Sequence, residues 1–431
     1  MKICMMTNTY LPHVGGVARS VSTFAEEYRK RGHKLLVVAP EFEGPALPRR
    51  QAQIVERVAA MQKFNGSDFS VRWPLAAGLS DRLENFQADI VHAHHPFLLG
   101  DTALRIGASK NVPVIFTHHT RYEDYTHYVP FDSPTLKEIA INLSTQFANL
   151  CDGVIAPSES IAKLIKKRGV ASPIAVVPTG VDVAGFAAGD GARARRRFRI
   201  PAGAFVVGHT GRLAPEKNLG YLAKAVALFL KKTPDARFLV VGGGPSEGEI
   251  GRICTEHGVA DRLIMAGKQT GRALHDAFKA MDVFVFASFS ETQGMVLAEA
   301  MSAGVPVVAL KANGVVEVVR EGKNGFLLPA RTTAEKFAAQ LGVLHAAPAR
   351  RRQFSRAAQA TAQEFSQENC AALALKFYEE IRLTTRRERL LTETSPWGKL
   401  GQRLAMEWDL LVQKTQTIVD AVTGNATAKA T

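Results

Sequence analysis

Short apolar segments alternate with helical segments along most of this chain, and this alternation limits the possible folds more than any other feature of the sequence. In the first half, the apolar segments predict strands over residues 3–6, 34–39, 90–93, 114–117, 153–156 and 174–177. The segments with helical spacing between them are residues 18–31, 139–150 and 158–168. Strands that are apolar throughout are typical of parallel sheets, which helices cover on both faces. The first half therefore predicts a doubly wound α/β domain built from βαβ units.

The same alternation restarts after an interruption at residues 184–200. That segment holds three glycines, five arginines and one aspartate, and it predicts a basic linker between two domains. Further strands and helices follow at 205–208, 219–231, 238–241, 263–266, 283–287, 294–302, 306–309 and 334–344. We predict one domain over residues 1–183, a second over 201–372, and C-terminal helices over 373–431 that partly cross back to the first. Because ligands bind at the carboxyl ends of strands in such domains, we expect the two domains to face a central cleft.

The excess of basic over acidic residues indicates which kinds of molecule the protein could bind. The chain has 54 lysines and arginines against 40 aspartates and glutamates, a net charge of +14. This excess favours nucleic acid, anionic lipid or a phosphorylated substrate, and it is equally consistent with a solvated basic surface. The arginine-rich stretch at 193–199 has no neighbouring aromatic stacking platform, so we expect no nucleic-acid partner.

The cysteines and the N-terminal residues indicate the type of cellular compartment in which the protein functions. The four cysteines lie far apart and form no CxxC pair, which excludes a zinc knuckle and a thioredoxin-type motif; they are Cys4, Cys151, Cys254 and Cys370. A disulfide framework is not expected in a chain of 431 residues, so the sequence indicates a reducing compartment. The chain begins as a strand, without an apolar leader, and it has no run of about 18 apolar residues. We therefore expect a soluble or peripheral protein.

Two glycines, Gly15 and Gly16, lie between the first predicted strand and the following helix. Glycines let the backbone approach a ligand closely, and the N-terminus of the helix suits a phosphate group. The pair is equally consistent with a plain tight turn, and it does not match the GxGxxG dinucleotide fingerprint. The glycines at 242–244 do not match that fingerprint either and predict a strand-to-helix turn.

Charged residues follow two strands of the second half. Arg212 and Lys217 are five residues apart in the loop after strand 205–208, where two cations can neutralise a diphosphate, although exposed loop cations are the simpler interpretation. Glu291 lies in the loop after strand 283–287, and Glu299 lies eight residues further on, in an apolar part of the next helix. Carboxylates accept hydrogen bonds from vicinal hydroxyls, so this pair fits recognition of a sugar or a ribose. A carboxylate in the surroundings of Glu299 needs polar partners.

Five histidines lie at the carboxyl ends of two neighbouring predicted strands of the first half: His92, His94, His95, His118 and His119. A histidine at the carboxyl end of a strand can reach a hydroxyl group of a ligand. No carboxylate or cysteine completes a recognisable set of metal ligands, so we expect no metal site.

These motifs together resemble the retaining glycosyltransferases of family 4, which have the GT-B fold. The resemblance rests on the glycine turn, on GRLAPEKN at 211–218 and on ETQGMVLAEAMSAGVPVV at 291–308, and it extends over about residues 1–385. The string THHTRYEDYTHY at 117–128 and the variant ETQG are similar to bacterial lipid glycosyltransferases that glucosylate diacylglycerol. Phosphatidylinositol mannosyltransferases and sulfolipid synthases are close alternatives.

The resemblance implies a role for each matching residue. The implied catalytic residues are His119, Arg212, Lys217 and Glu291. The implied donor-binding residues are Gly15, Gly16, Arg212, Lys217, Lys268, Glu291, Gln293, Gly294, Met295, Val296 and Glu299. In the family pattern, Gly16 contacts the β-phosphate, Arg212 and Lys217 hold the diphosphate, Glu291 and His119 contact sugar hydroxyls, Glu299 binds the ribose and Lys268 lies beside the base. The implied acceptor-side residues are Tyr122, Tyr125 and Tyr128.

The same resemblance implies the reaction. A hexose, glucose from UDP-glucose, would pass to a lipid hydroxyl such as that of diacylglycerol, with the α configuration retained and without a metal or other cofactor. The first domain would bind the acceptor and the second the nucleotide sugar. The implied location is cytoplasmic and peripheral, on the inner face of the cell membrane, with an anionic membrane surface as partner.

Two alternatives remain at this point: a transferase for another acceptor (phosphatidylinositol, a soluble sugar or a polysaccharide), and a non-catalytic adaptor bound to a membrane. Residues 399–422 predict a helix with an apolar stripe, which would contact either the membrane or the first domain. The sequence does not address the oligomeric state.

Overall fold

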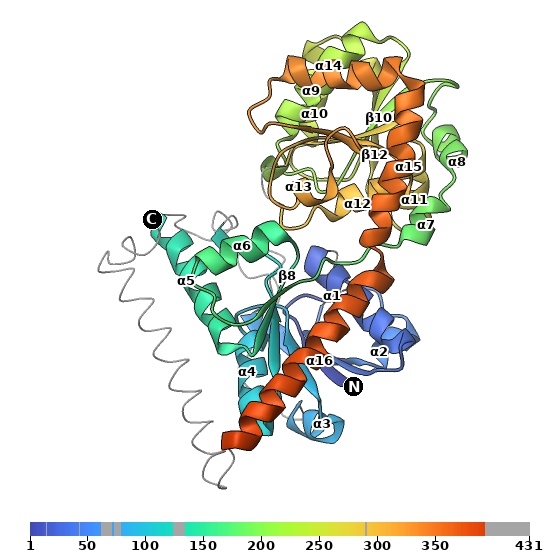
Figure 1. Ribbon diagram of the computed structural model, residues 1–431. Coiled ribbons are helices and arrows are strands. Elements are labelled where there is room, and N and C mark those ends of the chain that lie inside the picture. Colours follow the sequence, from blue (N-terminus) through green and yellow to red (C-terminus); the bar gives the residue numbers. More distant parts are fainter. Residues whose placement is uncertain are drawn as a thin grey trace. The chain divides into compact units, whose positions relative to one another are not determined.

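The protein forms two compact α/β units in the computed structural model, which describes residues 1–13, 15–42, 44–61, 71–72, 79–123, 134–288 and 291–392 (Figure 1). Unit 1 comprises Met1–Thr179 together with Ala371–Thr431, and unit 2 comprises Gly180–Cys370. Each unit has its own parallel sheet and its own hydrophobic core. The predicted pair of doubly wound domains is therefore confirmed.

Unit 1 is built on a sheet in which every neighbouring pair of strands is parallel, in the order β3-β2-β1-β6-β7-β8-β9. The strands are β1 (Lys2–Met6), β2 (Lys34–Pro40), β3 (Val55–Val58), β6 (Ile90–Ala93), β7 (Val114–Thr117), β8 (Gly153–Ala156) and β9 (Ile174–Val176). A separate antiparallel pair consists of β4 (Ala60–Met61) and β5 (Val71–Arg72). The helices are α1 (Gly16–Lys30), α2 (Arg49–Ala52), α3 (Leu79–Phe86), α4 (Leu99–Lys110), α5 (Pro134–Leu150) and α6 (Glu159–Lys167).

Unit 2 repeats this plan with the strand order β12-β11-β10-β13-β14-β15, again all parallel. The strands are β10 (Phe205–Thr210), β11 (Ala236–Val241), β12 (Leu263–Gly267), β13 (Val283–Phe286), β14 (Val307–Leu310) and β15 (Gly325–Leu328). The helices are α7 (Val183–Ala187), α8 (Gly191–Arg197), α9 (Leu219–Lys232), α10 (Glu247–Glu256), α11 (Gly271–Lys279), α12 (Met295–Ser302), α13 (Val315–Val318), α14 (Ala334–Ala346) and α15 (Pro348–Glu364). Two short 3₁₀ turns cover Pro215–Lys217 and Ala260–Arg262.

The pleat of the strands divides the core of unit 2 between the two faces of its sheet. Successive side chains of a strand point to opposite faces. Val207 accordingly packs with α9, α10 and α14, whereas its neighbour Val206 packs with α7, α11, α12 and α15. Both valines are fully buried, which explains why the strand is apolar at every position and why its sequence does not alternate.

Residues 184–200 are not a linker, contrary to the prediction. They form α7 and α8, which belong to unit 2. Two aspartates cap these helices: Asp182 Oδ1 accepts from Gly185 N at 2.9 Å, and Asp190 Oδ1 accepts from Arg193 N at 2.9 Å. The sequence signal for both helices was therefore an aspartate at each N-cap, which outweighs the glycines that follow it.

Two arginines of this segment have partners inside unit 2. Arg193 Nε donates to Asp276 Oδ2 at 2.6 Å, and Arg195 Nη2 donates to Asp282 Oδ2 at 2.9 Å. Arg193 lowers the pKa of the Asp276 carboxyl through this hydrogen bond and its charge, against the opposing effect of burial. Part of the local basic charge is thus used to attach α8 to helix α11 and to the residue that precedes β13.

Helix α16 (Gln367–Thr392) belongs to both units. Its first residues lie in unit 2, and from Ala371 onward it packs in unit 1. Gly153 in β8 makes room for it, since a Cβ there would lie 2.8 Å from the ring of Phe377. Residues 393–431, with the predicted helix at 399–422, lie outside the described residues.

Candidate active site

The predicted site residues gather where the strand order of each sheet reverses. In unit 1 the chain runs from β1 outward through β2 in one direction and through β6 in the other, so the reversal lies between β1 and β6. In unit 2 it lies between β10 and β13. The carboxyl ends of the strands at such a point leave a crevice in which α/β proteins bind ligands. The loops after β1, β6, β10 and β13 carry most of the predicted residues.

The glycine turn of unit 1 opens helix α1. Gly15 is its N-cap with an extended backbone, φ −161° and ψ 162°, and no side chain caps the helix. A Cβ at Gly16 would meet nothing within 4 Å, whereas one at Gly15 would lie 3.0 Å from His13 Nε2. The first turn of α1 carries no acidic residue. It therefore presents N–H groups and the positive end of the helix dipole, which suit an anion.

Lys217 and Glu291 form the central contact of the unit 2 site. Lys217 Nζ donates to Glu291 Oε1 at 2.6 Å, and both side chains are mostly buried, with exposed fractions of 19% and 16%. Asn218 reinforces the contact, because its Nδ2 donates to the carbonyl of Ala287 after β13. The two loops are thus tied together at the point where the strand order reverses.

Glu291 also connects this ion pair to helix α12. Its Oε2 accepts a hydrogen bond from Gly294 N at 3.3 Å. Gly294 is the N-cap of α12 with φ 73°, a left-handed conformation that glycine adopts without strain. A Cβ there would approach a side-chain carbon of Leu297 to 2.9 Å, so a larger residue would also collide. Met295 and Val296 begin the helix directly beside the carboxylate.

Arg212 lies at the same strand end but has its own partner. It forms an ion pair with Glu216 four residues on, and half of its side chain is exposed. The structure therefore places Arg212 and Lys217 in the same loop, each beside a different carboxylate. An anion that binds both cations must compete with Glu216 and Glu291.

The remaining predicted donor residues surround this point in unit 2. Glu299 lies one helical turn into α12 with a residue exposure of 3%. Gln293 is also buried, and its backbone packs closely against Gly314, where a Cβ would approach it to 2.7 Å. Lys268 follows β12 and is exposed; a Cβ on Gly243 would lie 3.0 Å from its Cε. Lys268 therefore lines the glycine turn after β11.

The five histidines of unit 1 form one cluster at the ends of β6 and β7. His94 Nδ1 and His119 Nε2 are 2.9 Å apart, and the rings of His92 and His94 lie 4.0 Å apart. Burial lowers the pKa of His92 to about 3 and that of His118 to about 4, and it holds the pKa values of His94 and His119 well below the usual range. The cluster is therefore uncharged at neutral pH. Among the described residues, no group of histidine, cysteine or carboxylate side chains is arranged to hold a metal ion.

On the predicted acceptor side the structure describes Tyr122, while Tyr125 and Tyr128 lie outside the described residues. The Tyr122 ring contacts Phe97 and His118 edge-on, with centroid distances of 5.5 and 5.9 Å. Burial raises the pKa of its hydroxyl, which therefore stays protonated.

Comparison with known proteins identifies the family to which this chain belongs. Residues 14–184 match the model of Glycosyltransferase Family 4, and residues 191–361 match that of Glycosyl transferases group 1. An alpha-monoglucosyldiacylglycerol synthase of Streptococcus pneumoniae is 30% identical over 319 residues, which cover 72% of this chain and 71% of the relative. The chain belongs to glycosyltransferase family 4.

Other relatives within the family differ in name. A GDP-mannose-dependent alpha-mannosyltransferase of Mycobacterium tuberculosis is 28% identical over 332 residues, covering 76% of this chain and 84% of the relative. Among solved structures, Anabaena Alr3699/HepE in complex with UDP-glucose matches with a TM-score of 0.67 and 23% identity, covering 88% of this chain and all of that one. This glycosyltransferase therefore has the GT-B fold. Among the helices of the described ranges, none has the length and apolar character needed to cross a membrane.

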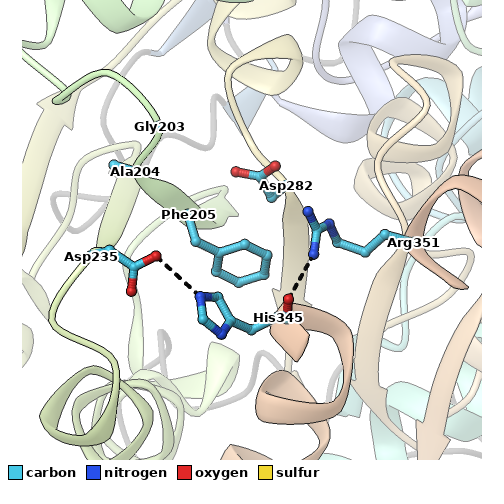
Figure 2. Close-up of a pocket in the computed structure, with 7 residues that line it drawn as sticks. All are labelled: Gly203, Ala204, Phe205, Asp235, Asp282, His345 and Arg351. Carbon is cyan, nitrogen blue, oxygen red and sulfur yellow. Dashed lines mark hydrogen bonds and ion pairs between the residues drawn. The ribbon is translucent and has the colours of Figure 1, made fainter. Parts of the chain in front are cut away.

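A hollow at the opposite end of the unit 2 sheet lies apart from these residues. Figure 2 shows its polar lining around Phe205, with a hydrogen bond of 3.1 Å between His345 Nε2 and Asp235 Oδ2. Asp235 and Asp282 precede β11 and β13, so the hollow lies at the amino ends of the strands. None of the predicted site residues lines it.

Two further groups in the glycosyltransferase were missed by sequence reasoning. Tyr378 of α16 bonds through its hydroxyl to His92 Nδ1, although 286 residues separate them. Glu123 is buried between Arg168 at 2.6 Å and Arg121 at 3.2 Å. Packing of distant segments brings Tyr378 to His92 and Arg168 to Glu123, so no local pattern could have identified these two pairs, whereas Arg121 is only two residues from Glu123.

Proposed function

We propose that this glycosyltransferase transfers glucose from UDP-glucose to the free hydroxyl of diacylglycerol, with the α configuration retained and without a metal ion. The observation that carries the proposal is the contact of 2.6 Å between Lys217 and Glu291 at the end of β10. An ammonium group beside a carboxylate suits a sugar nucleotide, which has a diphosphate and a sugar next to each other. The cation suits the diphosphate, and the carboxylate accepts hydrogen bonds from sugar hydroxyls.

The chemistry requires negative charge to be stabilised on the leaving diphosphate as the glycosidic bond breaks. Lys217, Arg212 and the N-terminus of α12 supply positive charge and N–H groups at one strand end. On donor binding, Lys217 exchanges Glu291 for the diphosphate, while Glu291 stays held by Gly294. Groups held in place before reaction cost little reorganisation in the transition state. The leaving phosphate takes the proton of the acceptor, which attacks from the same face of the sugar.

The choice of a lipid acceptor rests on two observations of different kinds. The relative from Streptococcus pneumoniae is named for the synthesis of monoglucosyldiacylglycerol. The net charge of +14 favours an anionic membrane surface, where each nearby lysine or arginine contributes about 1 kcal/mol. We infer a peripheral location on the inner face of the cell membrane, where diacylglycerol and a nucleotide sugar are both accessible.

The decisive experiment is a matrix of donors and acceptors on the purified protein. UDP-glucose, UDP-galactose and GDP-mannose are each incubated with diacylglycerol, phosphatidylinositol and soluble sugars, and products are identified by mass spectrometry. We expect glucosyldiacylglycerol from UDP-glucose, and about 10²–10³ times less product from the Lys217→Ala variant. A product from GDP-mannose or phosphatidylinositol alone would replace the donor or acceptor assignment. Absence of both transfer and donor hydrolysis would favour the non-catalytic adaptor.

Membrane binding is tested separately with liposomes. We expect the protein to sediment with vesicles that contain anionic lipid and to be released by added salt, because exposed charges are screened over about 10 Å at 0.1 M ionic strength. Binding to neutral and anionic vesicles alike, unchanged by salt, would contradict the electrostatic explanation. Deleting residues 396–431 separates two roles of that segment: loss of vesicle binding by a folded protein indicates a membrane contact, and loss of thermal stability indicates a structural one.

A further inference from the structure

Two histidines at neighbouring strand ends of unit 1 share one hydrogen bond. His94 follows β6, and His119 follows β7, the strand that pairs with it. His94 Nδ1 lies 2.9 Å from His119 Nε2, and the rings are nearly parallel, with 22° between their planes. Only one of these two nitrogens carries the shared hydrogen when both rings are neutral.

The surroundings of His94 decide which nitrogen donates. Its other nitrogen, Nε2, is buried and has no hydrogen-bond partner. If His119 donated, His94 would carry its hydrogen on that buried Nε2. A buried N–H without an acceptor is rarer and more costly than a buried lone pair without a donor. The favoured arrangement is therefore donation from His94 Nδ1–H to His119 Nε2.

We propose that His94 is a positioning residue, which holds His119 in the tautomer with its hydrogen on Nδ1 and so makes His119 a hydrogen-bond donor to a hydroxyl of the donor sugar. His119 in this state cannot take a proton through Nε2, because His94 occupies that lone pair. Its role is to orient the sugar, and general-base chemistry falls to another group. The assignment of the ligand hydroxyl rests on the proposed function; the tautomer does not.

The ring of His92, which contacts His94, has hydrogen-bond partners on two sides. The His92 ring contacts the His94 ring with a centroid distance of 4.0 Å and an angle of 41° between the ring planes. The Nε2 of His92 is 2.6 Å from Thr117 Oγ1, and its Nδ1 bonds to the Tyr378 hydroxyl of α16. The plane of the His94 ring is thus supported by β7 and by the crossing helix. Such support fixes the direction of the hydrogen that His94 donates to His119.

The tautomer is measured directly by NMR. In protein labelled with ¹⁵N-histidine, long-range ¹H–¹⁵N correlations distinguish a nitrogen that carries hydrogen from one that does not, and comparison with His119→Asn assigns the His119 signals. We expect the hydrogen of His119 on Nδ1, and a mixture of tautomers in His94→Leu. A hydrogen on Nε2 of His119 in the unmodified protein would overturn the proposal, whatever the substrate proves to be.

Kinetics provide the second test with a matched pair of variants. Asparagine and leucine have similar shapes, but only the asparagine amide can replace the donor at the Nδ1 position. We expect His94→Leu to lower kcat/KM for the sugar nucleotide about tenfold and His94→Asn to stay within about threefold of the unmodified protein. Adding His94→Leu to His119→Ala should cause no further loss, because the two residues act through one contact. Equal losses in His94→Leu and His94→Asn would overturn the proposal.

Discussion

The two units place their strand-end residues at the same topological position but build them from opposite kinds of chemistry. Unit 2 presents formal charges in ion pairs, Lys217 with Glu291 and Arg212 with Glu216. Unit 1 presents neutral imidazoles, centred on the buried His94 and the half-buried His119, beside a helix N-terminus that no side chain caps. Charges discriminate a charged ligand, whereas neutral rings orient hydroxyls without attracting ions. The same architecture can thus separate recognition of a diphosphate from recognition of uncharged groups.

Mutation of the charged residues in unit 2 should have the largest effect on turnover. We expect Lys217→Ala to reduce turnover by about 10²–10³, the magnitude typical of a lost group that stabilises developing negative charge. Circular dichroism checks that the fold is intact, and Glu216→Gln, which leaves Lys217 and Glu291 in place, is the matched control. A folded Lys217→Ala variant that retained a tenth of the normal turnover would show that the charge of unit 2 is not central.

The two glutamates of unit 2 should differ in what they affect. Glu299→Gln should raise the KM for the donor about tenfold with little change in kcat, because ribose recognition acts equally in the ground and transition states. Glu291→Gln should raise KM and lower kcat, since this carboxylate contacts both Lys217 and the N-terminus of α12. Steady-state kinetics in UDP-glucose separate the two, and identical patterns in both variants would refute the division of roles.

The stability of unit 1, which contains the neutral histidines, should be more sensitive to acid than that of unit 2. Burial lowers the pKa of His95 and of His118 to about 4, against an unfolded value near 6.5, so the unfolded state binds more protons between these values. The stability contributed by the neutral rings is therefore present above about pH 6.5 and lost as the pH falls toward 4. In the described part of unit 2, only His209 has a comparable shift, to about 4.

Calorimetry at pH 7 and pH 5 tests this difference. We expect the unfolding transition of unit 1 to fall by several degrees more than that of unit 2, which is identified as the transition raised by UDP. An equal fall in both transitions would mean that the buried histidines of unit 1 do not govern its response to acid.

The smallest expected effect is that of a chelator. Since lysine, arginine and a helix N-terminus carry positive charge at the strand ends of unit 2, we expect EDTA to leave the transfer rate unchanged. Initial rates with EDTA, and after addition of Mg²⁺ or Mn²⁺, measure this. Loss of activity that either ion restores would replace the metal-free proposal.

Strand positions were largely predictable because each strand is an apolar segment between turns. β6, β7 and β8 match their predicted bounds, and most other strands differ by one or two residues. Four strands were not predicted, for local reasons. β3 contains a glutamate and an arginine, β15 begins with glycine, and β4 and β5 are only two residues long. The predicted motifs lie at the sheet reversals because parallel strands bring the loops at their carboxyl ends to one edge.

The partners of the site residues could not be predicted from the sequence. Lys217 and Glu291 are 74 residues apart, and the spacing alone favoured exposed loop cations for Lys217 and Arg212. His94 and His119 were identified only as strand-end residues, and the nitrogen that each offers depends on ring orientation. Such contacts follow from the register of β6 against β7 and from the packing of α16, which no local pattern encodes.

The shared helix α16 has a consequence for synthesis on the ribosome. Because unit 1 comprises Met1–Thr179 and the chain from Ala371 onward, unit 2 is an insertion within it. All residues of unit 2 have been translated before Tyr378, the partner of Tyr28 and His92, has left the ribosome. We therefore expect unit 2 to complete its fold first, and unit 1 to complete its fold only after helix α16 has been synthesised. A nascent chain that has emerged from the ribosome as far as Cys370 should accordingly bind UDP before its histidine cluster is assembled.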